Sequence, residues 1–271
     1  MTAPDTRFEG AVPRLYETRL VPLLFEPYAS DLAGRVAARS PGSVLEVAAG
    51  TGAVTRELAA RLPASVSIVA TDLNPPMLEQ AAARGTARPV EWRPADAMRL
   101  PFDDASFDAV VCQFGAMFFP DRARAFAEAR RVLRPGGAFL FSTWDRIADN
   151  ELAACVQDAL AELFPHDPPR FMERTPHGYH DPARIARDLA DGGFAATPRV
   201  ERVTQRSRAE SASDAAVAFC QETPLREEIA ARDPAGLEAA TGAAERAIAA
   251  RFGGGAVDAK MQAFVVEVER D

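Results

Sequence analysis

Cysteine is scarce in this sequence, and long apolar runs are missing. The three cysteines, Cys112, Cys155 and Cys220, lie far apart with no CxxC spacing, so we expect no disulfide framework and a reducing, cytoplasmic location. No segment approaches the roughly 18 consecutive apolar residues of a membrane helix. The first ten residues, MTAPDTRFEG, lack a basic-then-apolar signal pattern. These absences argue against a secreted or membrane-spanning protein.

The sequence also has fewer basic than acidic residues. The formal net charge of -8 argues against a general nucleic-acid or anionic-membrane partner and leaves open only a local basic groove. Hydrophobic residues make up 48% of the 271 residues, which is enough for a sizeable core. The length fits either one large α/β domain with an insertion or two small domains.

Strands and helices alternate between residues 43 and 144. The apolar pattern predicts strands at 43–47, 66–72, 89–93, 107–112 and 138–144, with helices at 53–62, 74–83 and 121–133. This alternation predicts a doubly wound, mainly parallel sheet with right-handed crossovers and helices on both faces. Asn74 before Pro75-Pro76 predicts a helix start, with the asparagine as its cap.

The pattern changes after the fifth strand. Helical stretches at about 150–164 and 182–191 surround a loop rich in proline, and a sixth strand at 199–208, helices near 212–221 and 234–251, and a last strand at 261–268 follow. An insertion at this edge of a sheet is well placed to cover a ligand. We therefore divide the α/β chain of seven strands into an N-terminal helical cap broken at Pro22 and Pro27 (1–42), an α/β core (43–148), a helical lid (149–195) and a C-terminal part that completes the sheet (196–271).

The turn Ala48-Ala49-Gly50-Thr51-Gly52 joins the first strand to the next helix. Its small residues let a ligand approach the backbone and meet the free N–H groups at the helix start. Glu46, just before the turn, would repel a pyrophosphate, but it can bind a cation or orient the amides of the turn. We interpret the turn as a site for a zwitterionic nucleoside rather than for phosphate.

Four segments at successive strand ends resemble the class I S-adenosylmethionine-dependent methyltransferases. They are the EVAAGTG turn, Asp72, Asp96-Ala97, and FDAVVCQFGAMFF followed by RVLRPGG. The resemblance covers residues 43–144, and the layout is similar to that of quinone-biosynthesis C-methyltransferases. It implies a Rossmann-like fold with an antiparallel last strand, and S-adenosyl-L-methionine as the cofactor of the 43–148 core. The family usually has glycine at the position of Ala48 and often aspartate at that of Glu46.

The resemblance also implies a role for each residue around the turn. Asp72 would accept both ribose hydroxyls, Asp96 the adenine amino group, and the Ala97 N–H would meet a ring nitrogen. Leu73 and Met98 would sandwich the adenine ring, while Gln113 and Phe114 would face the methionine half. Tyr16 either closes the pocket or only packs there. The implied cofactor-binding residues are Glu46, Ala48, Gly50, Gly52, Asp72, Leu73, Asp96, Ala97, Met98, Gln113, Phe114 and Tyr16.

All three histidines, His166, His177 and His180, lie in the insertion. His177 or His180 could remove a proton from the acceptor, because histidine titrates near neutral pH. The alternative is that these are solvated loop histidines. Their spacing lacks a supporting cysteine or carboxylate pattern, so we predict no metal site.

Five arginines between residues 122 and 134 are predicted to form a solvated helix face. They are Arg122, Arg124, Arg130, Arg131 and Arg134. The Asn74-Pro75-Pro76-Met77 stretch resembles the box of nucleic-acid amino-methyltransferases, but it follows the second strand instead of the fourth and lacks the aromatic residue. We therefore interpret it as a helix cap.

Methyl transfer from a sulfonium is an in-line displacement, in which the protein aligns the nucleophile and excludes water. We predict transfer to a small-molecule acceptor through an O, N or C atom by a monomer or homodimer, with no nucleic-acid or membrane partner. Two alternatives remain open. An NAD-dependent oxidoreductase of Rossmann type also has an acid about 20 residues after the turn, where Asp72 stands. A non-catalytic protein could bind the same cofactor.

Overall fold

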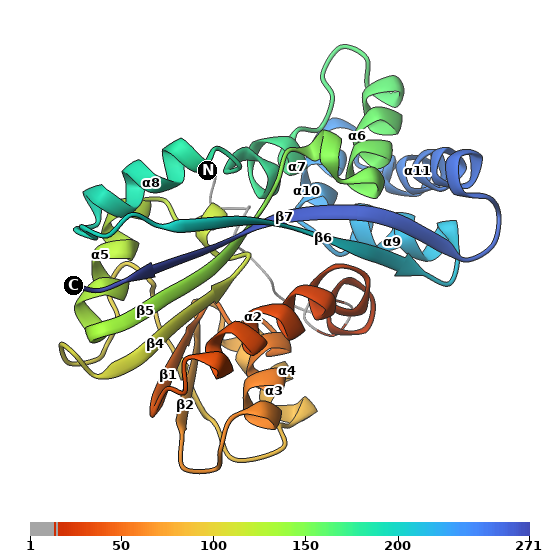
Figure 1. Cartoon of the computed structure of the whole chain (residues 1–271). Coiled ribbons are helices and arrows are strands. Elements are labelled where there is room, and N and C mark those ends of the chain that lie inside the picture. Colours follow the sequence, from red (N-terminus) through yellow and green to blue (C-terminus); the bar gives the residue numbers. More distant parts are fainter. Residues whose placement is uncertain (1–13, 15) are drawn as a thin grey trace. The chain divides into compact units, whose positions relative to one another are not determined.

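A seven-stranded sheet in the order β3-β2-β1-β4-β5-β7-β6 organises the computed structural model (Figure 1). The structure describes residue 14 and residues 16–271, so expectations for residues 1–12 fall outside it. The strands are β1 (Ser43–Val47), β2 (Ser67–Asp72), β3 (Glu91–Pro94), β4 (Phe107–Gln113), β5 (Leu133–Trp144), β6 (Arg199–Ala209) and β7 (Val257–Glu269). The predicted doubly wound fold is confirmed.

Strand direction divides the sheet. The first five strands pair in parallel. β7 runs antiparallel to β5, because the Asp145 N–H donates to the Gln262 carbonyl at 3.1 Å and the Arg270 N–H donates to the Gly137 carbonyl at 2.8 Å. The order reverses direction between β1 and β4, which is the switch point where open α/β sheets bind ligands.

Helical segments connect the strands. They are η2 (Tyr16–Phe25), α2 (Glu26–Ala38), α3 (Ala53–Arg61), α4 (Pro75–Arg84), η3 (Ala116–Phe118), α5 (Arg122–Val132), η4 (Ile147–Asp149), α6 (Glu151–Leu163), α7 (Phe171–Arg174), η5 (Pro176–Gly178), α8 (Pro182–Asp191), α9 (Ala212–Gln221), α10 (Leu225–Arg232) and α11 (Leu237–Phe252). None of the helices in the described part of the chain has the length and apolarity needed to cross a membrane.

Three local predictions were wrong. Pro22 lies inside the π-helix η2, so the break predicted there is absent. The break predicted at Pro27 falls at the boundary between η2 and α2, and Pro27 stands in the first turn of α2, where a proline removes no helical hydrogen bond. The fifth strand, predicted at 138–144, begins earlier, at Leu133, because residues 136 and 137 pair with Arg270. The helix α10 was missed, since it buries only Leu225 and Ile229 and leaves no periodic apolar pattern.

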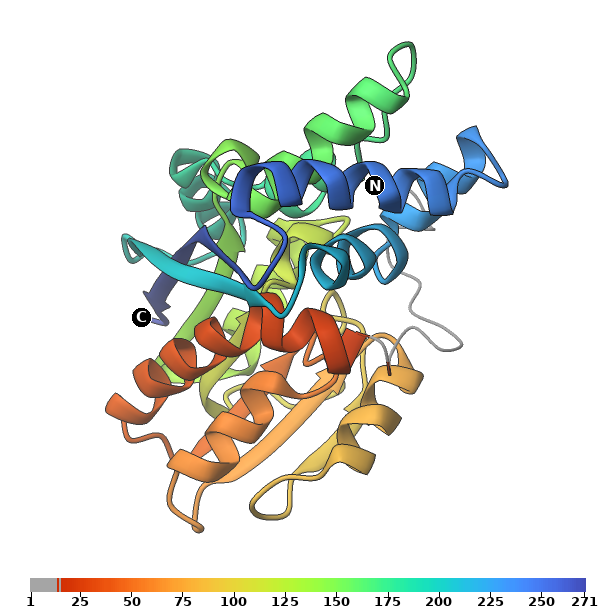
Figure 2. The same ribbon diagram turned by 90° about the vertical axis from the view of Figure 1, so that its right-hand side faces the viewer.

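The chain forms two compact units. The first comprises the described residues through Pro27 together with Trp144–Gly178 and Thr204–Gln262, and the second comprises Tyr28–Thr143, Tyr179–Val203 and Ala263–Asp271. In the first unit, α11 packs against α9 and α6 (Figure 2). In the second unit, Leu58, Val111 and Leu140 belong to one buried apolar cluster on the parallel strands. Both units are therefore discontinuous in sequence.

Candidate functional site

The predicted site residues of the core lie at the carboxyl ends of the parallel strands in the second unit, and we call this side of the sheet its carboxyl edge. Val47 pairs with Thr71, and Asp72 pairs with Pro94, so β1, β2 and β3 end side by side. Because β4 is parallel to β1, its end at Gln113 lies at the same edge. The structure therefore brings together the loops that carry Glu46, Ala48, Gly50, Gly52, Asp72, Leu73, Asp96, Ala97, Met98, Gln113 and Phe114.

The turn after β1 has three residues in the left-handed region, namely Ala48 (φ 54), Gly50 (φ 56) and Gly52 (φ 84). A Cβ at Gly52 would lie 3.0 Å from the Trp92 ring, whereas a Cβ at Gly50 would meet no atom within 4 Å. Gly52 is therefore required by both its backbone conformation and its packing. Gly50 leaves open space above the turn, into which a ligand could fit.

Asp72 connects this turn to the next loop. Its Oδ2 accepts a hydrogen bond from the Gly50 N–H at 2.9 Å, and its Oδ1 accepts one from the Asn74 N–H at 2.8 Å. Burial raises the pKa of Asp72, although these N–H groups lower it in part. Asn74 stands at the N-cap position of α4 as predicted, but its side chain donates to Asp72 at 3.3 Å and does not cap the helix.

Glu46 lies inside the unit, only 1% exposed. The Thr55 hydroxyl of α3 donates to Glu46 Oε2, and the Thr71 hydroxyl donates to the Glu46 carbonyl at 2.9 Å. Burial raises the pKa of Glu46 to about 8, while the bond from Thr55 opposes that shift. The carboxyl therefore holds α3 to β1. Neither threonine stands out in the sequence, because single threonines carry no signal of their own.

The turn after β4 packs directly on the turn after β1. Phe114 has a φ of 50, and its N–H donates to the carbonyl and the hydroxyl of Ser142, both at 3.2 Å. A Cβ at Gly115 would lie 2.6 Å from the Ala48 Cβ and 2.7 Å from the Cys112 Sγ. Gly115 therefore provides the room that the Ala48 methyl group needs. This compensation for the missing family glycine has no local signal in the sequence, because Gly115 and Ala48 lie far apart in the chain.

The loop after β3 is more exposed. Asp96 accepts a hydrogen bond from the Met98 N–H at 2.9 Å, and the Arg124 Nε donates to the Met98 carbonyl at 3.1 Å. Leu73 is 57% exposed, which is unusual for a large apolar side chain at a strand end. An apolar ring could pack on Leu73 at this edge.

The predicted solvated helix face forms only in part. Arg124 is exposed, but Arg122 and Arg131 are half-buried, and Arg134 belongs to β5 instead of α5. Arg131 donates to Glu128, Asp104 and two carbonyls. Arg134 donates to Ser43 and Asp108, and Arg122 donates to carbonyls of the turn after β4. Long side chains can satisfy nearby backbone groups while keeping part of their charge in water, and a charge pattern in sequence does not reveal this.

Tyr16 and His177 belong to the first unit, outside this group of loops. The Tyr16 ring stacks on Phe25 with centroids 5.2 Å apart. His177 is buried, and its Nδ1 lies 2.8 Å from the Asp145 carbonyl oxygen. His180 is half-buried in the second unit and His166 is exposed. Within the described residues, no group of three or more His, Cys, Asp or Glu could hold a metal ion.

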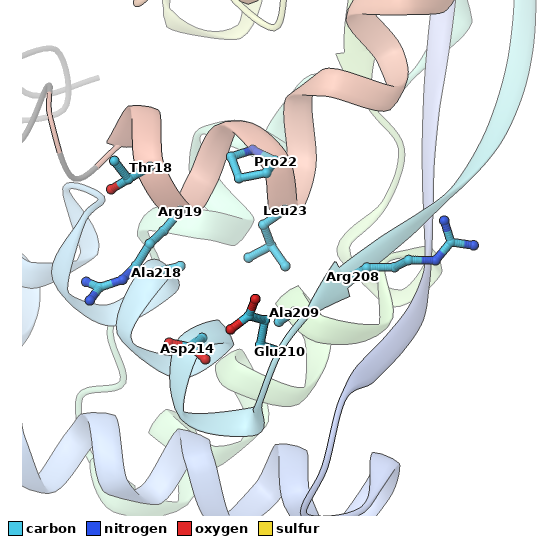
Figure 3. A pocket seen from close by; sticks show the side chains of 9 residues that line it. All are labelled: Thr18, Arg19, Pro22, Leu23, Arg208, Ala209, Glu210, Asp214 and Ala218. Atoms are coloured by element: carbon cyan, nitrogen blue, oxygen red, sulfur yellow. The ribbon is translucent and has the colours of Figure 1, made fainter.

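A separate cavity of about 500 Å³ lies within the first unit, between η2, the end of β6 and α9 (Figure 3). Arg19 on its wall pairs with the buried Glu222 at 2.7 Å, and the Arg208 side chain points away from it. The described lining contains none of the predicted cofactor residues. It consists of Thr18, Arg19, Pro22, Leu23, Arg208, Ala209, Glu210, Asp214 and Ala218.

Residues 45–141 match the family described as "Methyltransferase domain". A demethylmenaquinone methyltransferase of Deinococcus radiodurans is 46% identical over 107 residues, which cover 39% of this chain and 44% of that protein. A ubiquinone/menaquinone biosynthesis C-methyltransferase of a Geobacter species is 39% identical over 117 residues, covering 40% and 49% respectively. The chain spans less than half the length of these curated relatives.

Solved structures share the fold at low sequence identity. Phosphoethanolamine N-methyltransferase 2 of Haemonchus contortus, solved in complex with S-adenosyl-L-methionine, has a TM-score of 0.58 at 18% identity, covering 96% of this chain and 56% of its own. The YcgJ protein of Bacillus subtilis has a TM-score of 0.56 at 17% identity, covering 90% and 99% respectively. These likenesses show the fold alone.

Proposed function

We propose that this protein, whose residues 45–141 match a methyltransferase-domain family, binds S-adenosylmethionine and transfers its methyl group to a small molecule. The observation that carries the proposal is the link from Asp72 to Gly50 at 2.9 Å. It joins a buried carboxylate at the end of β2 to a left-handed turn with open space above it. Bound there, the cofactor supplies a methyl group already activated by the positive sulfur.

The residues at the sheet edge fit this cofactor. The Asp72 carboxylate retains acceptor capacity beyond its two N–H partners, so it could also accept the ribose hydroxyls. Thr51 Oγ1 is buried without a hydrogen-bond partner among the described residues, and it lies in the turn that would hold the methionine part. Leu73 and Met98 would flank the adenine ring, and Asp96 would accept its amino group. Gln113 and Phe114 would face the methionine half.

Positioning is the main catalytic task that this site would perform. The turns after β1 and β4 would hold the reacting groups in line and exclude water, and such alignment contributes on the order of 7–11 kcal/mol. His177 and His180 remain predictions for the base. We also propose a cytoplasmic location, which the three free cysteines support because they suit a reducing compartment. The net charge of -8 supports a small acceptor rather than a nucleic acid.

The structure changes the reason for preferring this cofactor over NAD. We expected Glu46 to repel a pyrophosphate, but its pKa of about 8 makes it mostly neutral at pH 7. The position of the third glycine in a G-x-G-x-x-G turn is instead occupied by Thr55, whose hydroxyl donates to Glu46. That glycine normally allows close packing of helix and strand. The threonine therefore supports a methyltransferase turn.

Calorimetry with S-adenosylhomocysteine and, separately, with NAD tests the proposal. We expect S-adenosylhomocysteine to bind and NAD to give no heat. A labelled-methyl assay on a panel of phenols, amines and quinols then distinguishes an enzyme from a non-catalytic protein that only binds the cofactor. Binding of NAD alone would contradict the proposed cofactor, and binding of the nucleoside without transfer to any acceptor would favour the non-catalytic alternative.

A further inference from the structure

The turn between β4 and α5 is held by one arginine. Arg122, the first residue of α5, donates from Nε to the Ala116 carbonyl at 3.2 Å and from Nη2 to the Met117 carbonyl at 3.0 Å. It forms no ion pair with any described residue, and its hydrogen-bond acceptors are neutral carbonyls. Burial lowers the pKa of Arg122, and the nearby charge of Asp188 offsets this only in part. A half-buried guanidinium without a directly paired carboxylate loses hydration, which its carbonyl partners must replace.

The same guanidinium contacts Tyr179, which precedes α8 in the predicted lid. Its Cζ lies 4.2 Å from the centroid of the Tyr179 ring, which is fully buried. The Arg184 Cζ lies 5.6 Å from the same ring. The helix α8, which begins three residues after Tyr179, packs against α5 in the second unit. Arg122 therefore bridges Tyr179 and the turn after β4.

That turn needs external support. Phe114 adopts a left-handed conformation that is common for glycine but rare for bulky side chains. Such conformations persist only where the surroundings impose them. Gly115 packs so closely on Ala48 that a small shift of the turn would displace the Ala48–Gly52 turn as well. The backbone of η3 contributes the bond from the Phe118 N–H to the Gly115 carbonyl at 2.9 Å. The Arg122 guanidinium holds the next two carbonyls.

We infer that Arg122 is a positioning residue for the cofactor, holding residues 113–118 in the binding conformation and connecting them to Tyr179. The inference rests on the proposed function, because the cofactor is the ligand that those residues would face. It concerns an arginine that sequence reasoning assigned to a solvated surface. Replacing it should weaken cofactor binding without contact between the replaced side chain and the cofactor.

Three variants test this inference by calorimetry with S-adenosylhomocysteine. Arg122→Met keeps the apolar stem but removes the guanidinium, and we expect a Kd raised roughly 5- to 20-fold. Arg122→Lys keeps a cation over the Tyr179 ring but cannot donate to both carbonyls in the same geometry, so its Kd should lie between those of Arg122→Met and wild type. The matched control is Arg187→Met, an exposed arginine of α8, whose Kd should be unchanged.

A second readout does not depend on the ligand. In the unliganded protein, the amide ¹H–¹⁵N signal of Gly115 should shift in Arg122→Met and return toward its wild-type position in Arg122→Lys. Tyr179→Leu should weaken binding in the same direction, and the Arg122→Met/Tyr179→Leu double variant should weaken it by less than the product of the two single effects. The melting temperature of each variant shows whether it remains folded.

The outcomes separate this inference from the proposed function. If the wild-type protein does not bind S-adenosylhomocysteine, the proposed function fails, and the Gly115 signal still tests whether Arg122 holds the turn. If the wild type binds and Arg122→Lys and Arg122→Met bind equally well with an unshifted Gly115 signal, the positioning role is overturned. If Arg122→Met does not fold, Arg122→Lys and Tyr179→Leu decide the matter by the same two measurements.

Discussion

The acidic side chains at the two ends of strands β1 and β4 differ in how their negative charge is stabilised. At their amino ends, Asp108 accepts hydrogen bonds from the N–H groups of Gly42 and Ser43 at 2.9 and 2.8 Å, and from Arg134 at 2.7 Å. Burial alone would raise the pKa of Asp108, but the bonds from Arg134, Ser43 and Gly42 lower it below its ordinary value. This acid is therefore stabilised in its charged form.

At the carboxyl ends, hydrogen bonds offset burial only in part, and no arginine is among the hydrogen-bond donors described for Glu46 or Asp72. Burial raises the pKa of both acids, and their hydrogen-bond donors are hydroxyl, amide and backbone N–H groups. Backbone strain does not distinguish the two ends, because non-glycine residues at positive φ lie on both sides, Ser40 and Ala105 before the strands and Ala48 and Phe114 after them. Buried acids with raised pKa values are typical of a functional site, whereas the ion-paired acid at the amino ends contributes stability.

The largest effect should come from Asp72→Asn. The new amide places its NH₂ donor against one of the two N–H groups, of Gly50 or Asn74, and it removes the charge that would bind the ribose. Two charge-assisted hydrogen bonds are worth about 1.5–3 kcal/mol each, so the Kd for S-adenosylhomocysteine should rise roughly 100-fold or more. Calorimetry measures this. Wild-type affinity in this variant would remove Asp72 from the site.

Glu46→Gln should remove a pH dependence of stability. The pKa of Glu46 rises from its ordinary 4.5 to about 8 in the folded protein. Between these values the folded state keeps a proton that the unfolded chain releases, so the free energy of unfolding falls as pH rises through this window. We expect a loss on the order of 2–4 kcal/mol between pH 5 and pH 8 in wild type and a smaller one in the variant.

Urea unfolding at pH 5 and pH 8 measures this difference. The exposed Glu57, which pairs with Arg61 on the helix surface, offers the control substitution Glu57→Gln. An equally steep pH dependence in Glu46→Gln and wild type would show that Glu46 does not hold the extra proton.

Asp108→Asn should lower the stability of the protein without weakening ligand binding, because Asp108 lies at the amino ends of the strands. Loss of the charged acceptor for Arg134, Ser43 and Gly42 should lower the free energy of unfolding by about 1–2 kcal/mol, since Arg134 is partly solvated. Binding of S-adenosylhomocysteine should stay within twofold of wild type. Urea unfolding measures the free energy of unfolding, and calorimetry measures the affinity for S-adenosylhomocysteine. A large loss of affinity in Asp108→Asn would show that the amino ends of the strands also contribute to binding.

Ala48→Gly should have the smallest effect. Glycine relieves a left-handed conformation that costs an L-residue roughly 1–2 kcal/mol, but it also raises the entropy of the unfolded chain. We expect a net stabilisation of no more than about 1 kcal/mol and equal or tighter binding of S-adenosylhomocysteine. A clear destabilisation would mean that the packing of the Ala48 methyl group on Gly115 outweighs its strain.

Local patterns in the sequence were sufficient for the parallel part of the sheet. Short, mostly apolar segments predicted the ends of β1, β2 and β4 at Val47, Asp72 and Gln113 to within one residue. Asp121 is the N-cap of α5 and accepts a hydrogen bond from the Arg124 N–H at 3.0 Å. The long last strand was underestimated at 261–268, because Val257 to Lys260 lack a clear apolar run. Contacts between turns were also missed, since no local pattern encodes them.

The amino-acid sequence by itself determined the alternation of strands and helices, the small residues of the first turn and the acid at the end of the second strand. These depend on side-chain period and on local backbone freedom, both of which act over a few residues. Tertiary structure alone decided that Glu46 is buried against Thr55, that Gly115 makes room for Ala48, and that Arg122 faces a turn instead of water. Burial and close packing depend on residues far apart in the chain, so they arise only once the chain has folded.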